Sequence, residues 1–420
     1  GHLDWRVRER DGLPLYKRAR QLAGRVEAHP GIRVFRAAPV TGIWGENLLT
    51  GFQKGGSGDG FDERHWECRA DCVVVATGAI ERPLVFSHND RPGVMQSDTA
   101  WRLARTYGVQ RRKAAVFSVG DDLGLEAALD LAGLGLRVHA VADARRDGHD
   151  PELVQRLHDA NIPFLPGHAA SRAMGRKWVT GVEIASLPID AGEHHGESES
   201  AQRAEDGRVR YFACDLLVAN AGRQPDIGVL STSGARFTHS SLTHTFELEH
   251  LPHGVFAAGG ALGLTDVDSI EASGQVAGLE ALQALDAEKV PHTIDQDVAR
   301  ELTEAQGRLD GLPPRPPGCG VLHGPHLGLG RKAFLDFDED GTWKNAVQCA
   351  AKGFDAPELS KRFGNFGLGP GQYRVPGQNV AMAMAKIGGQ PMDDIASTTV
   401  RPPVVAPSLA TLAGPAHDVL

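Results

Sequence analysis

The feature that most constrains this sequence is a strand–helix–strand pattern within residues 114–143. AAVFSV is a short apolar run typical of a strand, DDLGLEAALDLAGLG has helical spacing of its apolar residues, and LRVHAVAD predicts a second strand. Strand, helix and strand within about 30 residues form a βαβ unit, in which the two strands lie parallel. We therefore expect an α/β protein built around a parallel sheet.

The turn between this first strand and its helix, SVGDDLG, is a degenerate dinucleotide fingerprint. Such a fingerprint needs glycines where the turn is tight and where a pyrophosphate meets the helix N-terminus. Only Gly120 falls on that spacing. Asp143 ends the second strand, where an acid can hold a ribose hydroxyl. Asp121 and Asp122 place negative charge where phosphate would bind, so a Rossmann-type unit kept for packing remains an open alternative.

Two other turns fit the same architecture. VVVATGAIERP predicts a strand that ends in small residues, which let a cofactor approach the backbone because no bulky side chain blocks it. HGVFAAGGALG predicts a second such strand end. In flavoproteins of this architecture an Asp usually follows there and bonds the ribityl chain of FAD, but Gly260 stands in its place, which favours NAD or no cofactor. The candidate cofactor-binding residues of the two turns are Ala76, Thr77, Gly78, Glu81, Arg82, Ala258, Gly259 and Gly260.

The order of these motifs predicts the fold class. The turn at Ala221–Pro225, AGRQP, is typical of the return from a second domain into a first. The βαβ unit is then an insertion within the first dinucleotide domain. We expect an α/β, two-dinucleotide-binding-domain (pyridine nucleotide-disulfide oxidoreductase-like) fold plus a small helical domain. The expected segments are a first dinucleotide domain at 1–110, an inserted Rossmann-like domain at 111–215, the return segment at 216–290, a Pro/Gly linker at 291–330, a helical domain at 331–386 and a connector at 387–420.

Composition excludes several classes of partner. The formal charge of −9 provides no net basic field, so nucleic acid is not an expected partner. No apolar run reaches about 18 residues and no secretory signal opens the chain, so we expect no membrane span. Five scattered cysteines without a CxxC pair suit the reducing cytoplasm.

No metal site and no catalytic residue can be named from the pattern. Cys68 and Cys72 lack a second ligand pair, and His194 and His195 lie in a polar stretch expected to be a solvated hairpin loop. His88 and Arg91 in SHNDRPG are the most suggestive polar pair. Turn chemistry around the following Pro-Gly explains that loop equally well.

The motifs also carry a family resemblance. ATGAIERPLVFSHNDRPGVM, at residues 76–95, resembles the signature of the sarcosine oxidase alpha-subunit family. RKAFLDFDEDGTWKNAVQCAAKGF, SKRFGNFGLG and STTVRPPVVAPSLATLAG resemble later segments of that subunit, so the resemblance covers roughly residues 1–415. It implies a piece that begins after the first βαβ unit and stops before an aminomethyltransferase-like, folate-binding domain. We expect this piece to be inactive alone.

The resemblance implies cofactors and partners. In this family the alpha subunit carries NAD, FAD belongs to the beta subunit and FMN sits between the two. The complex oxidatively demethylates sarcosine, so the implied substrate is sarcosine or a related secondary amine. The implied partners are a beta-type flavin-bearing subunit and further small subunits.

This sequence differs from related proteins at two points that bear on its cofactors. Relatives such as the large subunits of opine oxidase, hydrogen cyanide synthase and hydroxyproline dehydrogenase carry a [2Fe–2S] cluster, which needs four thiolates. Only Cys349 and the preceding Cys319 are available, so we expect no iron–sulfur cluster. The segment PGQYRVPGQN differs from the family's Asp-Gln-Gly-Lys-Thr-Ser-Asn-like loop, keeping Gln372, Arg374 and Asn379, which leaves flavin contact and substrate open.

Two other functions stay open besides the alpha-subunit hypothesis. One is a free-standing NAD(P)H/flavin-dependent reductase, disfavoured by the missing CxxC and by Gly260. The other is a non-catalytic scaffold subunit of an amine dehydrogenase complex, favoured by the degenerate fingerprint.

Overall fold

The structure, a computed structural model, describes residues 8–56, 59–109, 114–187, 209–285, 292–320 and 332–413. The predicted βαβ unit is confirmed: β9 (Ala114–Val119) and β10 (Arg137–Asp143) pair in parallel on either side of α3 (Asp122–Gly133). Three further strands extend this sheet in the parallel order β11-β10-β9-β15-β8. They are β11 (Phe164–Pro166), β15 (Leu216–Ala219) and β8 (Val94–Met95).

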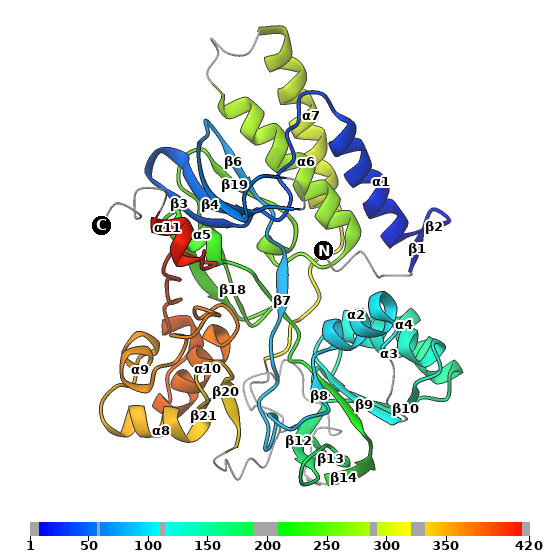
Figure 1. Cartoon of the computed structure of the whole chain (residues 1–420). Coiled ribbons are helices and arrows are strands. Elements are labelled where there is room, and N and C mark those ends of the chain that lie inside the picture. The colour runs from blue at the N-terminus through cyan, green and yellow to red at the C-terminus, as the bar shows by residue number, and fades with distance from the viewer. Residues whose placement is uncertain are drawn as a thin grey trace.

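Both faces of this sheet are covered, as Figure 1 shows. Helices α2 (Ser97–Tyr107), α3 and α4 (Pro151–Asp159) pack on one face. The other face packs against an antiparallel sheet of β12 (His168–Met174), β13 (Gly181–Ser186) and β14 (Val209–Ala213). We call residues 94–219 the inserted unit. Its sheet includes β8 and β15, which lie just outside the expected range 111–215 on either side.

The surrounding residues, 8–81 and 223–310, form what we call the first unit. Its three-stranded sheet is β3 (Val40–Trp44), β4 (Leu48–Lys54) and β5 (Glu63–Arg69), and its long helices are α1 (Leu15–Ala28), α6 (Val267–Ala284) and α7 (His292–Asp310). Smaller elements complete it: β1 (Glu9–Arg10), β2 (Leu13–Pro14), α5 (Gly228–Thr232), β17 (Arg236–Ser240), β18 (Thr245–His250) and the 3-10 turns at Gly45–Asn47 and Gly259–Leu262.

The first unit contains one expected strand and corrects one expected boundary. The strand predicted at VVVATGAIERP is β6 (Val73–Val75), whose Val74 is 43% exposed. Among the described residues β6 pairs with one strand, β19 (Val255–Ala257), and the core lies on the side of Val73 and Val75. Helix α7 occupies nearly half of the expected linker at 291–330. Four of the linker's prolines lie at 313–317, after the helix, whereas Val298, Leu302 and Ala305 follow helical spacing and are buried.

The first and inserted units are joined by two antiparallel strands, β7 (Ala79–Glu81) and β16 (Arg223–Pro225). Strand β7 leads out of the first unit and β16 returns to it, and β7 crosses the middle of Figure 1 between the two lobes. The predicted insertion of the βαβ unit between two parts of the first unit matches this path.

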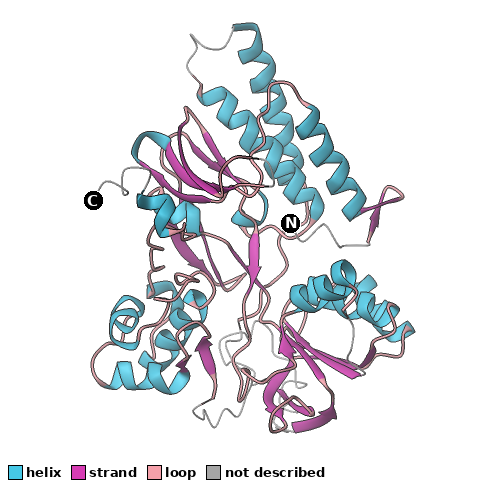
Figure 2. Ribbon diagram, in the orientation of Figure 1, coloured by secondary structure: helices cyan, strands magenta, loops and turns pink. Residues whose placement is uncertain are grey.

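The third lobe, which we call the helical unit, consists of residues 332–394 (Figure 2). The expected helical domain contains α8 (Trp343–Ala351) and α9 (Pro357–Gly364) beside a hairpin of β20 (Phe334–Asp336) and β21 (Gly341–Thr342). Its third helix, α10 (Gly377–Gly388), lies at the centre of the unit, since residues 377–385 are all buried. A 3-10 turn at Met392–Asp394 and a short α11 (Leu409–Ala413) follow.

Candidate functional site

The two small-residue turns of the first unit lie side by side. Strands β6 and β19 pair in parallel, so Ala76–Gly78 and Ala258–Gly260 both leave the same edge. Gly260 packs directly on the backbone of Gly78, since a Cβ added to Gly260 would lie 2.8 Å from the Gly78 carbonyl carbon. Gly78 itself has φ +83°, which only glycine adopts readily. Both glycines are therefore required by the backbone geometry of this edge.

The return turn meets the same edge. The Thr77 hydroxyl donates to the Asp226 carbonyl at 2.9 Å, and the Asp226 N–H donates to the Gly78 carbonyl at 2.9 Å. The Gly259 N–H donates to the Ser273 hydroxyl at 3.0 Å. The three sequence motifs thus converge in space, and much of their polar backbone is already paired within the chain.

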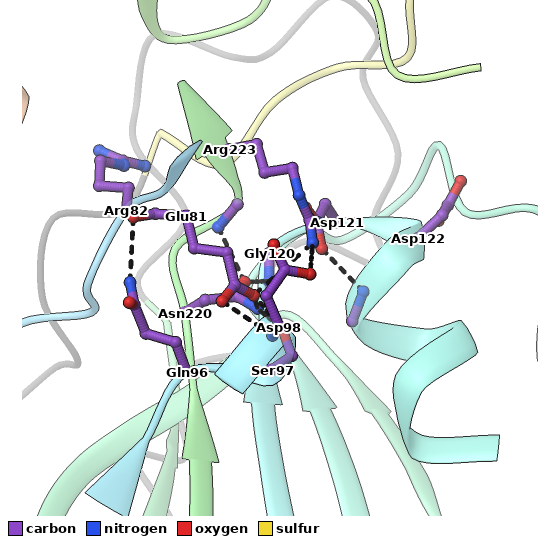
Figure 3. A network of polar contacts seen from close by, with 12 residues as sticks. Glu81, Arg82, Gln96, Ser97, Asp98, Gly120, Asp121, Asp122, Asn220 and Arg223 are labelled. Carbon is purple, nitrogen blue, oxygen red and sulfur yellow. Dashed lines mark hydrogen bonds and ion pairs between the residues drawn. The ribbon is translucent and has the colours of Figure 1, made fainter. Parts of the chain in front are cut away.

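Glu81, at the end of β7, has a buried carboxylate that four neighbours contact (Figure 3). One oxygen accepts hydrogen bonds from the Ser97 hydroxyl and, at 3.0 Å, from the Asn220 amide. The other accepts the Asp98 N–H at 2.9 Å. The Arg223 guanidinium lies 3.8 Å away. Glu81 therefore ties the crossover strand to the start of α2 and the end of β15.

Burial dominates the ionisation of Glu81. Desolvation raises the pKa of its carboxyl from 4.5 to about 7, because removal from water disfavours the charged form. The nearby Arg223 charge lowers the pKa, and the charges of Asp98 and Asp121 raise it. Glu81 consequently exchanges its proton near neutral pH, unlike a surface glutamate.

Arg223 is the cation of this network. Its side chain is 3% exposed and its two terminal nitrogens donate to Asp98 and Asp121. These carboxylates belong to α2 and to the turn before α3, whereas Arg223 lies on β16. Figure 3 shows the three side chains converging at the carboxyl end of the parallel sheet. The network therefore joins the inserted unit to its return strand.

Gly120, the one fingerprint glycine, contacts the chain's own backbone. A Cβ at Gly120 would lie 2.8 Å from the Gly222 nitrogen, the Ala221 carbonyl carbon and the Cβ of Cys319. The adjacent Asp121 caps α3 by accepting the Gly124 N–H at 2.8 Å. Because residue 120 has no side chain, the backbone before β16 and the Pro-rich segment (residues 312–319) can pack against it.

Asp143 is fully buried and turned toward Arg145. It accepts the Arg145 backbone N–H at 2.9 Å and a guanidinium nitrogen at 2.8 Å. Burial raises the pKa of Asp143, which the Arg145 charge opposes. The same guanidinium donates to Asp122 at 2.7 Å. The Asp143 carboxylate therefore faces the chain's own side chains, Arg145 and, at 3.6 Å, His149.

Arg82 is fully buried and joins three parts of the chain. Its guanidinium donates to the carbonyl of Ala221 at 2.9 Å and to that of Cys319, and it contacts the Met382 sulfur at 2.6 Å. Desolvation lowers the pKa of Arg82. The crossover between the first and inserted units, the Pro-rich segment at residues 312–319 and the helical unit meet at this side chain, which points to a positioning role.

A cavity of about 390 Å³ opens beside these groups, between the inserted and first units. The first turns of α3 and α6 and the segment from Leu312 to Cys319 contribute to its wall. Four arginines of the wall pair with acids: Arg8 with Glu126, Arg145 with Asp122, Arg223 with Asp121 and Arg315 with Glu247. The charges of these four side chains are thus already balanced within the chain.

The loop PGQYRVPGQN of the helical unit, which differs from the family pattern, contacts the crossover strands. Arg374 donates to Asp226 through two nitrogens, one at 3.0 Å, and the Arg374 carbonyl accepts the Gln224 amide at 2.7 Å. Asn379 donates to the Pro83 carbonyl at 2.7 Å, while Gln372 has φ +50° in the turn before them. The residues that this loop keeps from the family pattern therefore hold the helical unit against the return strand.

The remaining candidates lie elsewhere. His88 has φ +63° and donates its N–H to the Lys332 carbonyl, and Arg91 donates to the Ala173 carbonyl, so turn geometry accounts for both. Desolvation, followed by the charge of Arg91, lowers the pKa of His88. His194 and His195 lie outside the described residues. The described residues contain no group of three or more His, Cys, Asp or Glu side chains placed to hold a metal. No helix in the described ranges is long and apolar enough to cross a membrane.

The sequence did not reveal the polar network. Glu81 and the AGRQP turn were noted, but Ser97, Asp98, Asn220 and Arg223 were not assigned to a site. They come from two strands and a helix far apart in the chain. The position of Arg223 four residues after the end of the buried strand β15 was the available signal.

Comparisons with known proteins agree with this architecture. Residues 330–415 match the family model of the sarcosine oxidase A3 domain. The chain is 26% identical over 353 residues to the sarcosine oxidase subunit alpha of Rhizobium meliloti (strain 1021), covering 84% of this chain and 32% of that protein. It is 26% identical over 388 residues to the corresponding subunit of Corynebacterium sp. (strain P-1), covering 89% and 37%. The chain thus spans about a third of the length of the curated relatives it matches.

A solved structure shares the fold. The L-proline dehydrogenase from P. horikoshii superposes with a TM-score of 0.68 at 19% identity, covering 99% of this chain and 72% of that one. The expected two-dinucleotide-binding-domain fold with a small helical domain is confirmed. The chain is accordingly similar to the alpha subunit of sarcosine oxidase over most of its length, and its residues 330–415 match the sarcosine oxidase A3 domain.

Proposed function

We propose that this chain is part of an alpha-type subunit in a sarcosine oxidase-like complex, an oxidoreductase that oxidatively demethylates sarcosine or a related secondary amine. The observation that carries the proposal is similarity to two sarcosine oxidase alpha subunits over 84% and 89% of the chain, together with the A3 domain. The proposed partners are a beta-type flavin-bearing subunit and further small subunits, in the cytoplasm.

The proposed cofactor of the chain itself is NAD, held by the first unit. Backbone at Ala76–Gly78 and at Ala258–Gly260 forms a flat edge without large side chains, which fits close approach of a dinucleotide. Gly260 supplies no carboxylate for a ribityl chain, which supports NAD over FAD at this edge. The described residues include no glycine-rich phosphate turn for this unit. Glu81 and Arg82 would support the backbone of this edge without touching the nucleotide, since both side chains are buried.

Flavin is proposed to be held by, or shared with, a partner subunit, where it would accept the electrons of amine oxidation. The chain's own contribution is then to bind nucleotide and to fix the helical unit through Arg374 and Asn379. The cysteine content supports a complex without an iron–sulfur cluster, because the described helical unit holds the single thiol of Cys349.

Nucleotide content tests the proposal. The complete complex, purified through a tag on this chain, is expected to produce peroxide with sarcosine, and the separated chain is expected to be colourless and to release NAD on denaturation. A yellow chain active with NAD(P)H alone would support the free-standing reductase. A complex without amine oxidation, and a chain without nucleotide, would support the scaffold, which the internally paired turn at Gly120 favours as second candidate.

A further inference from the structure

We propose that the inserted unit receives no dinucleotide, because the Asp121 carboxylate, paired with Arg223, occupies as an internal anion the position that such a unit keeps for a pyrophosphate. The inference goes beyond the proposed function and rests on it only in the choice of NAD as the probe. Three independent features of the turn between β9 and α3 support it.

The first feature is the use of the helix N-terminus. In dinucleotide-binding units the free N–H groups of this first turn bind phosphate, and the helix dipole favours its negative charge. Here Asp121, the residue that precedes α3, accepts the Gly124 N–H with its carboxylate at 2.8 Å. The dipole is therefore already complemented by an anion of the chain.

The second feature is the cation that pairs with this anion. The other Asp121 oxygen accepts from Arg223, whose side chain is 3% exposed, and Asp98 accepts from the same guanidinium. A phosphate entering the turn would have to displace a buried ion pair. It would also approach the carboxylate of Asp122, which raises the electrostatic cost further.

The third feature is the space around Gly120. The backbone of Gly222 and the Cβ of Cys319 approach within 2.8 Å of where a Cβ would be. On the side where a Cβ of Gly120 would point, the close approach that a fingerprint glycine permits is thus made by the chain's own backbone, although the cavity of about 390 Å³ lies beside this turn. At the end of β10, Arg145 already holds both oxygens of Asp143, the acid expected to bind ribose.

Hydrogen–deuterium exchange in about 5 mM NAD locates any bound nucleotide. This concentration is more than about a hundred times a micromolar dissociation constant, so a functional site would be nearly saturated. We expect no change in peptides covering 118–126 and 143–150. Protection of those peptides would overturn the inference. Protection of residues 73–81 and 255–263 by NAD tests the proposed function alone. If these residues are not protected, NAD is removed from the proposed function, and the inference about the inserted unit still stands.

A matched pair of variants tests the internal anion. Asp121→Asn and Asp266→Asn both alter a helix cap, since Asp266 accepts the Ser269 N–H at 2.8 Å at the start of α6. Asparagine preserves capping, so each cap should be largely kept. We expect the unfolding temperature of Asp121→Asn to fall about 5 °C further than that of Asp266→Asn, because Arg223 loses a buried partner. Equal unfolding temperatures would overturn the internal ion pair.

Discussion

Glu81 is the residue whose charge depends most on the fold. Its folded-state pKa of about 7 lies above the ordinary 4.5, so the folded protein holds a proton that the unfolded chain releases. A group of this kind contributes stability at low pH that is lost as pH rises from about 4.5 through about 7. The wild-type unfolding temperature should therefore fall across this window.

Glu81→Gln should remove that fall, because glutamine resembles the protonated acid at every pH. We expect the free energy of unfolding of the variant to rise relative to that of the wild type as pH increases, by up to about 3 kcal/mol above about pH 7.5. Thermal unfolding at several pH values measures it. Glu271→Gln is the control, since its pair with Arg18 lowers the pKa of Glu271 and gives the opposite pH trend. Parallel curves for Glu81→Gln and wild type would contradict the assignment.

Gly260 tests the packing of the strand edge at the same scale. Gly260→Ala places a Cβ 2.8 Å from backbone atoms of Gly78 and Ala79, and should destabilise the protein by about 1–3 kcal/mol. Gly274→Ala, in α6 with nothing within 4 Å of the added Cβ, should stabilise it by about 0.5–1 kcal/mol. Denaturant titration compares them, and equal effects would mean that the edge is looser than described.

Between elements, the buried pair of Asp143 and Arg145 fixes the end of β10 to the start of α3. Arg145→Met leaves Asp143 buried without its cation and should cost about 3–5 kcal/mol. Adding Asp143→Asn to that variant should restore much of the loss, as a double-mutant cycle by denaturant unfolding would show. Arg300→Met removes an exposed pair with Asp297 and should change stability by less than about 1 kcal/mol. Additive effects of the Asp143 and Arg145 changes would exclude the coupling.

Periodicity and turn chemistry predicted the local elements well. The βαβ unit appears where the apolar spacing placed it, because β9, α3 and β10 bury their apolar side chains in one cluster. Helix α7 was missed because nearby prolines masked its spacing. The juxtaposition of the two small-residue turns followed from parallel strands sharing an edge.

The polar partners of the site could not be read in the same way. Arg223 pairs with residues 125 and 102 positions away, so the pairing is set by the crossover of β7 and β16. Burial also decides the outcome at Asp143, whose place after a strand predicted ribose contact but whose carboxylate faces Arg145. Sequence identifies such residues as candidates, and tertiary packing determines what each one meets.

At the scale of the whole molecule, apolar packing of Ala381 and Ala385 against Phe246 and a few polar contacts together hold the helical unit in place. The Arg374 guanidinium binds Asp226 through two nitrogens, and both side chains are less than a third exposed. Charge-assisted pairs of this bidentate kind are the stronger ones in proteins. The pair should therefore contribute measurably to docking of the helical unit against the return strand.

Arg374→Met should loosen that docking without unfolding either unit. We expect amide exchange of residues 224–226 and 377–382 to accelerate about tenfold, equivalent to about 1.4 kcal/mol of opening free energy. Arg362→Met, which removes an exposed pair with Glu358 within α9, should leave these rates unchanged. Hydrogen–deuterium exchange of both variants measures the difference. Unchanged exchange in Arg374→Met would show that Asn379 and the apolar contacts hold the helical unit without the ion pair, whereas acceleration across the whole chain would indicate global destabilisation instead.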